Sequence, residues 1–421
     1  MNPASETDLG CAGPAGRNTL RVDAARQLIL DSIRPVGGWE MVPVRDALGR
    51  ILARDVIAPC NVPAHDNSAM DGYAIRAADL AAQGDTTLDV VGTAFAGRAF
   101  SGIVGAGQAV RIMTGAVMPH GADAVVVQEI TRSEGNKVVI PPGQRAGQNL
   151  RRAGEDLALG SAALAAGKRI RPADLGLIAS LGIAEVAVAR RLRVAFFSTG
   201  DELASIGRPL APGEVYDSNR YTLFGALTRL GFELLDMGVV PDEPATMEAA
   251  FAQAARHADV ILTTGGVSVG EADFIRELMD KLGEVRFWKL EIKPGRPMAF
   301  GHLGGAWLFG LPGNPVAVMV TFYQIVQDAL LRMAGMDPLP PRPLLEVVCA
   351  DRLRKNPGRR EYPRGKLEFA DGRWQVRTTG AQGSGILRSM SEADCFIILD
   401  EECAGVEAGE RVTVQLFEGL I

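Results

Sequence analysis

Three polar, glycine-bearing segments come directly after apolar runs that predict buried strands. They are residues 198–202 (STGDE), 263–273 (TTGGVSVGEAD) and 310–315 (GLPGNP). Glycine allows backbone N–H groups to approach an anion, and the helix predicted after each segment adds a favourable dipole. One such segment is often an ordinary tight turn, whereas three at one sheet edge favour a phosphate-binding site. The chain has neither a Walker lysine pattern nor GxGxxG, which disfavours ordinary ATPase and dinucleotide-binding folds.

Acidic side chains crowd the same predicted edge. Carboxylates beside a phosphate repel it unless a cation lies between them, and Mg²⁺ typically binds one or two carboxylates together with phosphate oxygens. Helix N-capping is the alternative, because Asp242 precedes Pro244 and Asp273 lies near a predicted helix start. The acidic residues concerned are Asp201, Glu202, Asp242, Glu271 and Asp273.

Cationic residues form a third group, in the segment WKLEIKPGRP at 288–297 and in the pair Arg151 and Arg152. Strand alternation places Lys289, Glu291 and Lys293 on one face, where the two lysines could attract an anion. A solvated strand face is the alternative, since the intervening residues are apolar. Arg296 follows in the same segment.

Two further segments are less specific. DNSAMDGYA at 66–74 is expected to pair with RIMTGA at 111–116 in one β module, although such polar stretches are often plain turns. A C-terminal basic run alone suggests RNA binding, but a solvated face is the more common reading. The basic run comprises Arg352, Arg354, Lys355, Arg359, Arg360, Arg364 and Lys366, and GAQGS follows at 380–384.

Composition narrows the class of protein. The chain has 421 residues, 47% of them hydrophobic, and a net charge of −6, which argues against a dedicated nucleic-acid binder. The five cysteines form no CxxC pair, so neither a disulfide framework nor a structural zinc site is expected. No apolar run reaches the length needed to span a bilayer, and the start of the chain lacks a signal-like apolar stretch, so the cytoplasm is expected.

The elements that must position these residues predict an α/β multidomain protein. Apolar runs at 193–198, 233–239, 259–264 and 307–311 alternate with helical patterns, which is typical of a doubly wound, mostly parallel sheet. Flanking regions carry short β-prone runs separated by Gly and Pro. The predicted parts are a flexible tail (1–17), a small split α+β domain (18–58 and 162–191), an inserted β domain (59–161), the doubly wound domain (192–337) and a C-terminal β domain (338–421).

Taken together, the motifs resemble the MoeA family of molybdopterin molybdenumtransferases, which includes the E domain of gephyrin. The resemblance covers about residues 18–421. Beyond the segments above, it rests on GQNLRRAGED at 147–156, FSTGDEL at 197–203, YDSN at 216–219, GLPGNPVA at 310–317, NPGRREYPRG at 356–365 and TTGAQGSG at 378–385.

The resemblance implies that molybdate is inserted into adenylylated molybdopterin, with release of AMP assisted by Mg²⁺. It implies a catalytic set of Asp71, Thr114, Glu202, Asp242 and Asp273, of which Glu202, Asp242 and Asp273 would hold the metal. The implied substrate-binding residues are Arg151, Asp156, Gly265, Gly266, Ser268, Lys289, Lys293, Arg296, Pro312, Pro315, Arg364 and Ser384.

The resemblance also implies a homodimer, with transient contacts to other molybdenum cofactor synthesis proteins and no nucleic acid or membrane partner. Two alternatives remain at this point. One is a molybdopterin adenylyltransferase, a related family that shares the doubly wound domain but usually lacks the flanking β domains. The other is a non-catalytic scaffold of the gephyrin kind.

Overall fold

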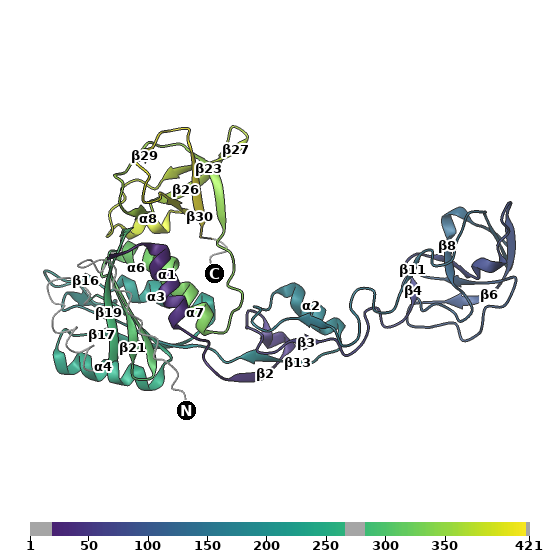
Figure 1. Ribbon diagram of the computed structural model, residues 1–421, viewed down its shortest axis with the longest axis horizontal. Coiled ribbons are helices and arrows are strands. Elements are labelled where there is room, and N and C mark those ends of the chain that lie inside the picture. The colour runs from purple at the N-terminus through teal and green to yellow at the C-terminus, as the bar shows by residue number, and fades with distance from the viewer. Residues whose placement is uncertain (1–18, 266–282, 418–421) are drawn as a thin grey trace, which may run out of the picture. The chain divides into compact units, whose positions relative to one another are not determined.

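The computed structural model describes residues 19–265 and 283–417 (Figure 1). The chain forms two compact units. We call residues 1–40 with 189–421 the sheet unit, and residues 41–188 the insert unit. Each unit is described by itself below.

A seven-stranded sheet is the centre of the sheet unit, in the order β1-β19-β21-β22-β18-β14-β17. β21 runs antiparallel to both of its neighbours, and the other adjacent pairs are parallel, as predicted for a mostly parallel sheet. The strands are β1 (Thr19–Leu20), β14 (Arg193–Thr199), β17 (Glu233–Val240), β18 (Val260–Thr264), β19 (Gly283–Leu290), β21 (Pro297–Leu303) and β22 (Ala306–Leu311).

Helices cover both faces of this sheet (Figure 1). On one face α4 (Pro244–His257) closes a core in which Phe197 meets Phe251 edge to face, with ring centroids 5.1 Å apart. The opposite face carries α1 (Val22–Ser32), α3 (Ser218–Leu230), α6 (Pro315–Thr321) and α7 (Gln327–Met333). α3 ends at Gly231 in the left-handed conformation, as its sequence pattern predicts.

The first helix corrects the expected domain assignment. We expected residues 18–58 to join the split domain, but β1 pairs with β19 and α1 packs against α7 in the sheet unit. The reason lies in the buried face of α1, which consists of Val22, Ala25 and Ile29. Leu28, on another face of the helix, is 39% exposed.

One long helical run corrects the membrane expectation. Among the described residues, Pro315–Met333 is long and apolar enough to cross a membrane by length and composition. Within the protein 83% of its 18-residue apolar stretch is buried, so the run is a core helix. It contains a π-helical segment, η4 (Phe322–Val326), between α6 and α7.

The C-terminal part of the sheet unit is a small closed barrel in the order β23-β27-β26-β28-β30. Its core includes Val376, Cys395, Ile397 and Val414, all fully buried. The barrel strands are β23 (Leu344–Cys349), β26 (Arg364–Ala370), β27 (Arg373–Thr378), β28 (Cys395–Ile398) and β30 (Arg411–Leu416). Outside the barrel, β25 (Arg360–Glu361) pairs with β20 (Ile292–Lys293).

The insert unit contains a six-stranded sheet in the order β8-β5-β7-β6-β10-β9. Segments before and after this sheet share a separate core, in which Leu52, Ile178 and Val188 are buried. The sheet strands are β5 (Gly72–Ile75), β6 (Thr86–Ala94), β7 (Gln108–Ile112), β8 (Ala124–Val127), β9 (Arg132–Glu134) and β10 (Lys137–Ile140). The other elements include β4 (Asn67–Ser68), β11 (Leu150–Arg151) and α2 (Pro172–Ser180).

Candidate functional site

The carboxyl ends of three neighbouring strands bring the polar loops together. In the sheet register Ser198 of β14 lies beside Thr264 of β18, which in turn lies beside Leu311 of β22. The three loops therefore leave the same edge, as the sequence predicted. In open parallel sheets this is the edge at which ligands bind. We call it the carboxyl edge.

Gly265 is required by the geometry of this edge. Its φ is +87°, and a Cβ placed there would lie 2.3 Å from the backbone oxygen of Thr199. Only glycine therefore fits between the loops that follow β14 and β18. The Cβ position of Gly313 is 3.8 Å from Cα of Gly265, so the third loop lies close to the same point. Gly266 and Ser268 lie outside the described residues.

The acidic residues at the carboxyl edge are partly brought together. The Asp201 carboxylate accepts a hydrogen bond of 3.2 Å from the backbone N–H of Asp242, which joins the loops after β14 and β17. The N-cap of α4 is Glu243, so capping does not account for Asp242. Glu202 is exposed and folds its carboxylate over Gly200.

The structure leaves the metal prediction open. Among residues 19–265 and 283–417, no group of three His, Cys, Asp or Glu side chains is placed to hold a metal ion. Asp273, the third carboxylate of the predicted set, lies outside those ranges. The donor chemistry at the edge is nevertheless of the right kind, since Mg²⁺ prefers carboxylate and phosphate oxygens.

Asp217 holds the end of β14 at the carboxyl edge to the start of α3. It was not among the site residues predicted from the sequence. It is 2% exposed and caps α3, accepting a hydrogen bond of 3.2 Å from the Arg220 N–H. It also accepts one of 2.9 Å from the Ser198 hydroxyl, which lies 3.1 Å from the Thr264 hydroxyl. The available signal was Asp-Ser-Asn before a helical pattern, because Asp is a preferred N-cap.

Asn219 was also missed, and it holds the Pro-Gly-Asn-Pro loop. Its carboxamide donates a hydrogen bond of 2.7 Å to the backbone oxygen of Gly313, 94 residues away. Its side chain is nearly buried, with 8% exposure. The predicted loop residues Pro312 and Pro315 flank this bond, and Pro315 is the first residue of α6.

The loop of Ser384 reaches the same helix start. The backbone oxygen of Ser384 accepts a hydrogen bond of 3.0 Å from the N–H of Val316 in the first turn of α6. The structure thus brings a residue of the C-terminal part to the Pro-Gly-Asn-Pro loop. The resemblance implies Ser384 and Arg364 together as substrate-binding residues.

Arg364 is placed differently from that expectation. It is 1% exposed, and its guanidinium donates to the Ser389 hydroxyl at 3.0 Å and to the Gly383 backbone oxygen at 3.1 Å. Burial lowers the pKa of Arg364 to about 10. Its side chain therefore holds the loop that carries Ser384, and its charge lies inside the protein.

The segment that contains Lys289 and Lys293 alternates as predicted. Both lysines are exposed, whereas Leu290 and Ile292 are fully buried. Lys293 forms an ion pair with Glu361, with Nζ and Oε2 3.0 Å apart, so part of its charge is already compensated. This pattern is also what a solvated strand face would show.

The loop after Lys293 packs against α6. Gly295 has φ +101°, and a Cβ there would lie 2.8 Å from the Thr321 hydroxyl oxygen. Arg296, the next residue, is exposed, and its backbone oxygen accepts a hydrogen bond of 2.7 Å from the Leu290 N–H. The segment is therefore anchored beside the first turns of α6.

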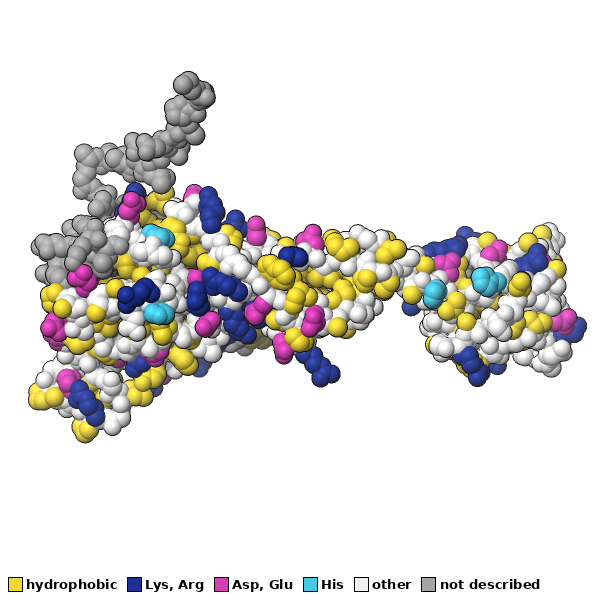
Figure 2. Space-filling view, turned by 90° about the horizontal axis from the view of Figure 1, so that it is seen from below, with side chains coloured by type: hydrophobic (Ala, Val, Ile, Leu, Met, Phe, Trp, Pro, Cys, Tyr) yellow, Lys and Arg dark blue, Asp and Glu magenta, His cyan; other side chains and the backbone are white. Residues whose placement is uncertain are grey.

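The C-terminal basic run is largely used within the fold. Lys355 is 6% exposed and donates to the backbone oxygens of Glu401 and Cys403 at 3.2 and 3.0 Å. Arg360 forms ion pairs with Asp23, Asp400 and Glu401. On the face shown in Figure 2, the coloured basic and acidic side chains are intermingled. Neither the RNA reading nor a simple solvated face describes Lys355 and Arg360.

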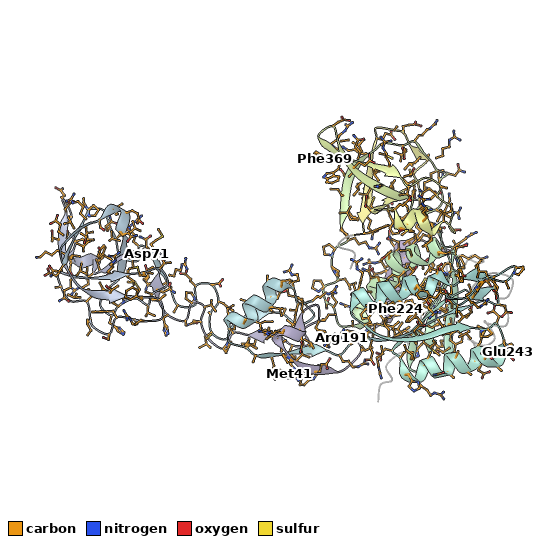
Figure 3. All side chains as sticks on the ribbon, turned by 180° about the vertical axis from the view of Figure 1, so that it is seen from behind. Met41, Asp71, Arg191, Phe224, Glu243 and Phe369 are labelled. Atoms are coloured by element: carbon orange, nitrogen blue, oxygen red, sulfur yellow. The ribbon has the colours of Figure 1, made fainter. Side chains whose placement is uncertain are left out.

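Asp71 and Thr114 meet in the insert unit (Figure 3 labels Asp71). β5 pairs with β7, Gly72 opposite Ile112, which confirms the expected pairing of the two motifs. One Asp71 carboxylate oxygen accepts hydrogen bonds of 2.7 Å from both the hydroxyl and the backbone N–H of Thr114. These bonds, that from the hydroxyl first, lower the pKa of Asp71.

Arg151 and Asp156 lie on a segment that pairs with the chain leading to Asp71. Arg151 pairs with Asn67 between β11 and β4, and the neighbouring Arg152 donates a hydrogen bond of 2.9 Å to Asp66. Asp156 is exposed, and its N–H donates to a backbone oxygen at 3.1 Å. Three motifs thus converge on the segment that begins at Asp66.

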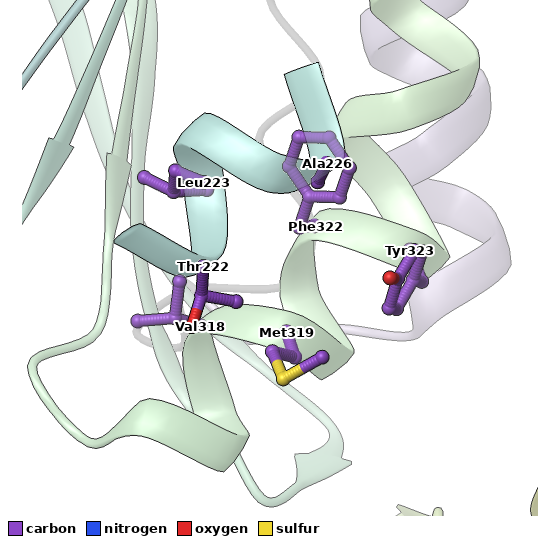
Figure 4. A pocket seen from close by; sticks show the side chains of 7 residues that line it. All are labelled: Thr222, Leu223, Ala226, Val318, Met319, Phe322 and Tyr323. Carbon is purple, nitrogen blue, oxygen red and sulfur yellow. The ribbon is translucent and has the colours of Figure 1, made fainter. Parts of the chain in front are cut away.

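A gap between α3 and the α6–η4 run is not a substrate site (Figure 4). It has no room even for a water molecule, and it is lined by Thr222, Leu223, Ala226, Val318, Met319, Phe322 and Tyr323. The lining includes no charged side chain, so the gap offers nothing that would bind an anion.

Comparisons with protein families match nearly the whole chain. Residues 20–182 match the MoeA N-terminal region (domain I and II), and residues 195–332 match a probable molybdopterin binding domain. Residues 346–417 match the MoeA C-terminal region (domain IV). The three matches follow one another in the order that the predicted parts require.

Individual relatives agree with these matches. The chain is 44% identical over 404 residues to a molybdopterin molybdenumtransferase of Haemophilus influenzae, covering 96% of this chain and 100% of that one. For the Bacillus subtilis protein of the same name the identity is 36% over 409 residues, covering 95% and 94%. The crystal structure of a molybdopterin biosynthesis MoeA protein from Pyrococcus horikoshii matches with a TM-score of 0.81 and 30% identity, over 95% of this chain and 100% of that one. The chain belongs to the MoeA family of molybdopterin molybdenumtransferases.

Proposed function

We propose that this enzyme inserts molybdate into adenylylated molybdopterin and releases AMP. The observation that carries the proposal is the carboxyl edge, where three glycine-bearing loops converge and Gly265 leaves no room for a side chain. Such an edge offers backbone N–H groups to phosphate oxygens. The relatives from Haemophilus influenzae and Bacillus subtilis are named molybdopterin molybdenumtransferases, and an anion-binding site of this kind fits that reaction.

Cations near α6 would steer the two anionic substrates. Lys289 and Arg296 are exposed, and Lys293 shares its charge with Glu361. We propose that these three side chains attract molybdate and the pterin phosphate, since long-range attraction raises the local concentration of an anion. Arg364 would act through another group, by fixing the loop of Ser384.

A divalent cation, Mg²⁺ by preference, would be held by Glu202, Asp242 and Asp273. When bound it would compensate the charge that develops on the departing phosphate oxygens. The residues of this chain would hold the phosphates and exclude competing orientations. Asp201 would keep the loop of Asp242 in place through the bond to its backbone N–H.

Asp71 would contribute a charged oxygen from the insert unit. Thr114 occupies one carboxylate oxygen, so the other remains able to accept a hydrogen bond or a proton from substrate. Arg151 lies opposite Asn67, Asp156 donates its N–H to Val62, and both would contact the pterin end. We further propose a homodimer in which Asp71 of one chain completes a site with Asp242 of the other.

Mixed dimers test the shared site. Asp71→Ala and Asp242→Ala, each inactive alone, are dissociated together and allowed to reassociate. One site of a mixed dimer then carries both lesions and the other carries none, so about a quarter of wild-type activity should return. Mixed dimers that are detected by mass and remain inactive would show that both residues act within one chain.

The cellular setting is part of the proposal. Among the described residues Cys60, Cys349, Cys395 and Cys403 are free thiols, which suits a reducing cytoplasm. Proteins that make adenylylated molybdopterin and proteins that accept the finished cofactor would be transient partners. The adenylyltransferase alternative is not favoured, because the flanking MoeA regions are both matched.

Reconstitution tests the proposed reaction. The purified protein is incubated with adenylylated molybdopterin, molybdate and Mg²⁺, and both AMP and active cofactor are measured. AMP release that depends on molybdate supports the proposal. Transfer of an adenylyl group to molybdopterin would identify the alternative activity instead.

A further inference from the structure

We propose that a buried polar network holds the C-terminal barrel in the orientation that places the Ser384 loop on the first turn of α6. The network, which we call the barrel lock, consists of Gln324, Asp328, Arg342 and Gln415. Its catalytic consequence rests on the proposed function, but its structural effect can be measured without any activity.

Gln324 is the centre of the barrel lock. Its carboxamide N–H donates a hydrogen bond of 2.9 Å to the side-chain oxygen of Gln415 in β30. Its own side-chain oxygen accepts from the guanidinium of Arg342, and its backbone oxygen accepts from the same guanidinium at 2.7 Å. Gln324 and Gln415 both have 0% exposure. The Gln324 side chain thus joins β30 of the barrel to Arg342, which lies in the linker between α7 and β23.

Asp328 extends the barrel lock by one helical turn. Its carboxylate accepts a hydrogen bond of 3.1 Å from Arg342 and forms an ion pair with Arg26 of α1. Asp328 is only 7% exposed. The charge of its carboxylate is therefore balanced by these two arginines and not by water. The linker that carries Arg342 is therefore fixed to both α7 and α1.

The centre of the barrel lock lies in a π-helical segment of the helix. In an α-helix a mid-helix carbonyl is engaged by an N–H four residues on. Gln324 lies within η4, and its carbonyl also accepts from the Arg342 side chain. Single π turns inside α-helices are frequent at functional sites. In Gln324 both the main-chain oxygen and the side-chain oxygen accept from Arg342.

The barrel lock differs from the rest of the contact between helix and barrel. Tyr323 stacks near Phe396 and Phe417 with ring centroids 6.2 Å apart in each case. Apolar contacts of this kind tolerate small shifts, whereas buried hydrogen bonds are directional and costly when unmet. We infer that the aromatic rings stabilise the contact and that the barrel lock sets its orientation.

This orientation reaches the proposed site along the same helix. The run that contains Gln324 begins at α6, where the N–H of Val316 donates to Ser384 at 3.0 Å. A rotated barrel would satisfy the aromatic contacts but would withdraw Ser384 from the helix start. Gln324 is therefore a positioning residue for the anion site and does not itself contact substrate.

Gln324→Leu tests the barrel lock, with Tyr323→Leu as the matched control on the same helix. Hydrogen exchange is measured on the peptide that contains Val316. Exchange at Val316 should become about tenfold faster in Gln324→Leu, because the bond to Ser384 opens more often. In Tyr323→Leu it should stay within about twofold once both proteins are compared at equal global stability.

A rescue variant separates position from general damage. In Gln324→Glu the carboxylate still accepts from Arg342, and Gln415 can turn its carboxamide to donate, because its Nε2 has no hydrogen-bond partner among the described residues. Exchange at Val316 should return to the wild-type rate. In the activity assay, Gln324→Leu should raise the molybdate concentration for half-maximal AMP release about fivefold while kcat is retained.

The outcomes divide cleanly. Unchanged exchange at Val316 in folded Gln324→Leu, or a Gln324→Glu protein as perturbed as Gln324→Leu, would overturn the barrel lock. If Gln324→Leu does not fold, Gln415→Leu removes one hydrogen bond only and is judged by the same exchange rate. Altered exchange in a protein that shows no molybdate-dependent activity would support the barrel lock and count against the proposed function alone.

Discussion

The carboxyl edge and the turn that holds Asp71 would contribute to the proposed reaction in different ways. At the carboxyl edge strand register and Gly265 set the loop geometry, so the main chain would make most of the contacts with substrate. In the insert unit a single side chain, Asp71, would supply the charge, and Thr114 holds it in place. Binding through backbone N–H groups depends on the conformation of the loops, whereas binding through Asp71 depends on one carboxylate charge. Substitutions in the two regions should therefore fail in different ways.

Gly265→Ala should have the largest combined effect, because it should lower both activity and stability. The added Cβ would meet the Thr199 backbone oxygen at 2.3 Å and would occupy a residue with φ +87°. We expect AMP release to fall at least about a hundredfold and stability to drop by roughly 2–4 kcal/mol. Steady-state kinetics and urea unfolding measure both quantities.

Gly225→Ala is the matched control, because a Cβ at this position in α3 meets nothing within 4 Å. It should retain full activity and gain roughly 0.5–1 kcal/mol of stability, since alanine favours the helix. Wild-type activity in Gly265→Ala would show that the close approach at the edge has no role in substrate binding.

Asp71→Asn should reduce activity without reducing stability. Asparagine can still accept the two bonds from Thr114 but carries no charge. The expected loss of AMP release is about 10²–10⁴-fold, the range for a group that handles a proton. A thermal melt should coincide with that of the wild type. A loss confined to stability would assign Asp71 to the fold and leave the insert unit without its proposed charge.

Lys293→Gln should have a moderate effect on one substrate. The Lys293 side chain is 51% exposed but that of Glu361 is 13% exposed, so loss of the ion pair should cost about 1 kcal/mol. The molybdate concentration for half-maximal rate should rise about fivefold, as one attractive charge is removed. Glutamine is used in place of a charge reversal at position 293, because a second carboxylate there would repel Glu361. An unchanged molybdate dependence would leave Lys293 as a solvated strand residue.

Thr114→Val should have the smallest effect, visible in the pH profile. The Thr114 hydroxyl is the first cause of the lowered pKa of Asp71, so its removal raises that pKa toward the ordinary value. A lowered carboxyl pKa in the folded state keeps the charge present as pH falls. The acid limb of AMP release should therefore move to higher pH in the variant. An unshifted acid limb would mean that another group controls it.

Much of the carboxyl edge follows from local patterns. Buried parallel strands are nearly continuous apolar runs, and the predicted runs at 193–198 and 259–264 coincide with β14 and β18. The meeting of DNSAMDGYA with RIMTGA was also predicted and is confirmed by the pairing of β5 with β7. These features depend on residues close in sequence or on the alternation of strand and helix.

The remainder depends on partners far apart in sequence. Lys293 is compensated by Glu361, 68 residues away, and no local pattern announces that pair. Arg364 belongs to a basic run but is buried by the fold, so charge in the sequence did not show whether the charge faces solvent. The placement of α1 was wrong for a similar reason, because its contact with α7 joins residues about 300 apart and no local pattern shows it.

The mass of the pterin product tests the central claim most directly. Wild-type protein, Asp242→Ala and an EDTA-treated sample are each given adenylylated molybdopterin and molybdate, and the recovered pterin is analysed together with free nucleotide. We predict a pterin that has gained molybdenum and lost its adenylyl group in the wild type, with one AMP per pterin, and little change in the other two samples. A wild-type pterin that keeps its adenylyl group, or equal conversion in all three samples, would contradict this prediction.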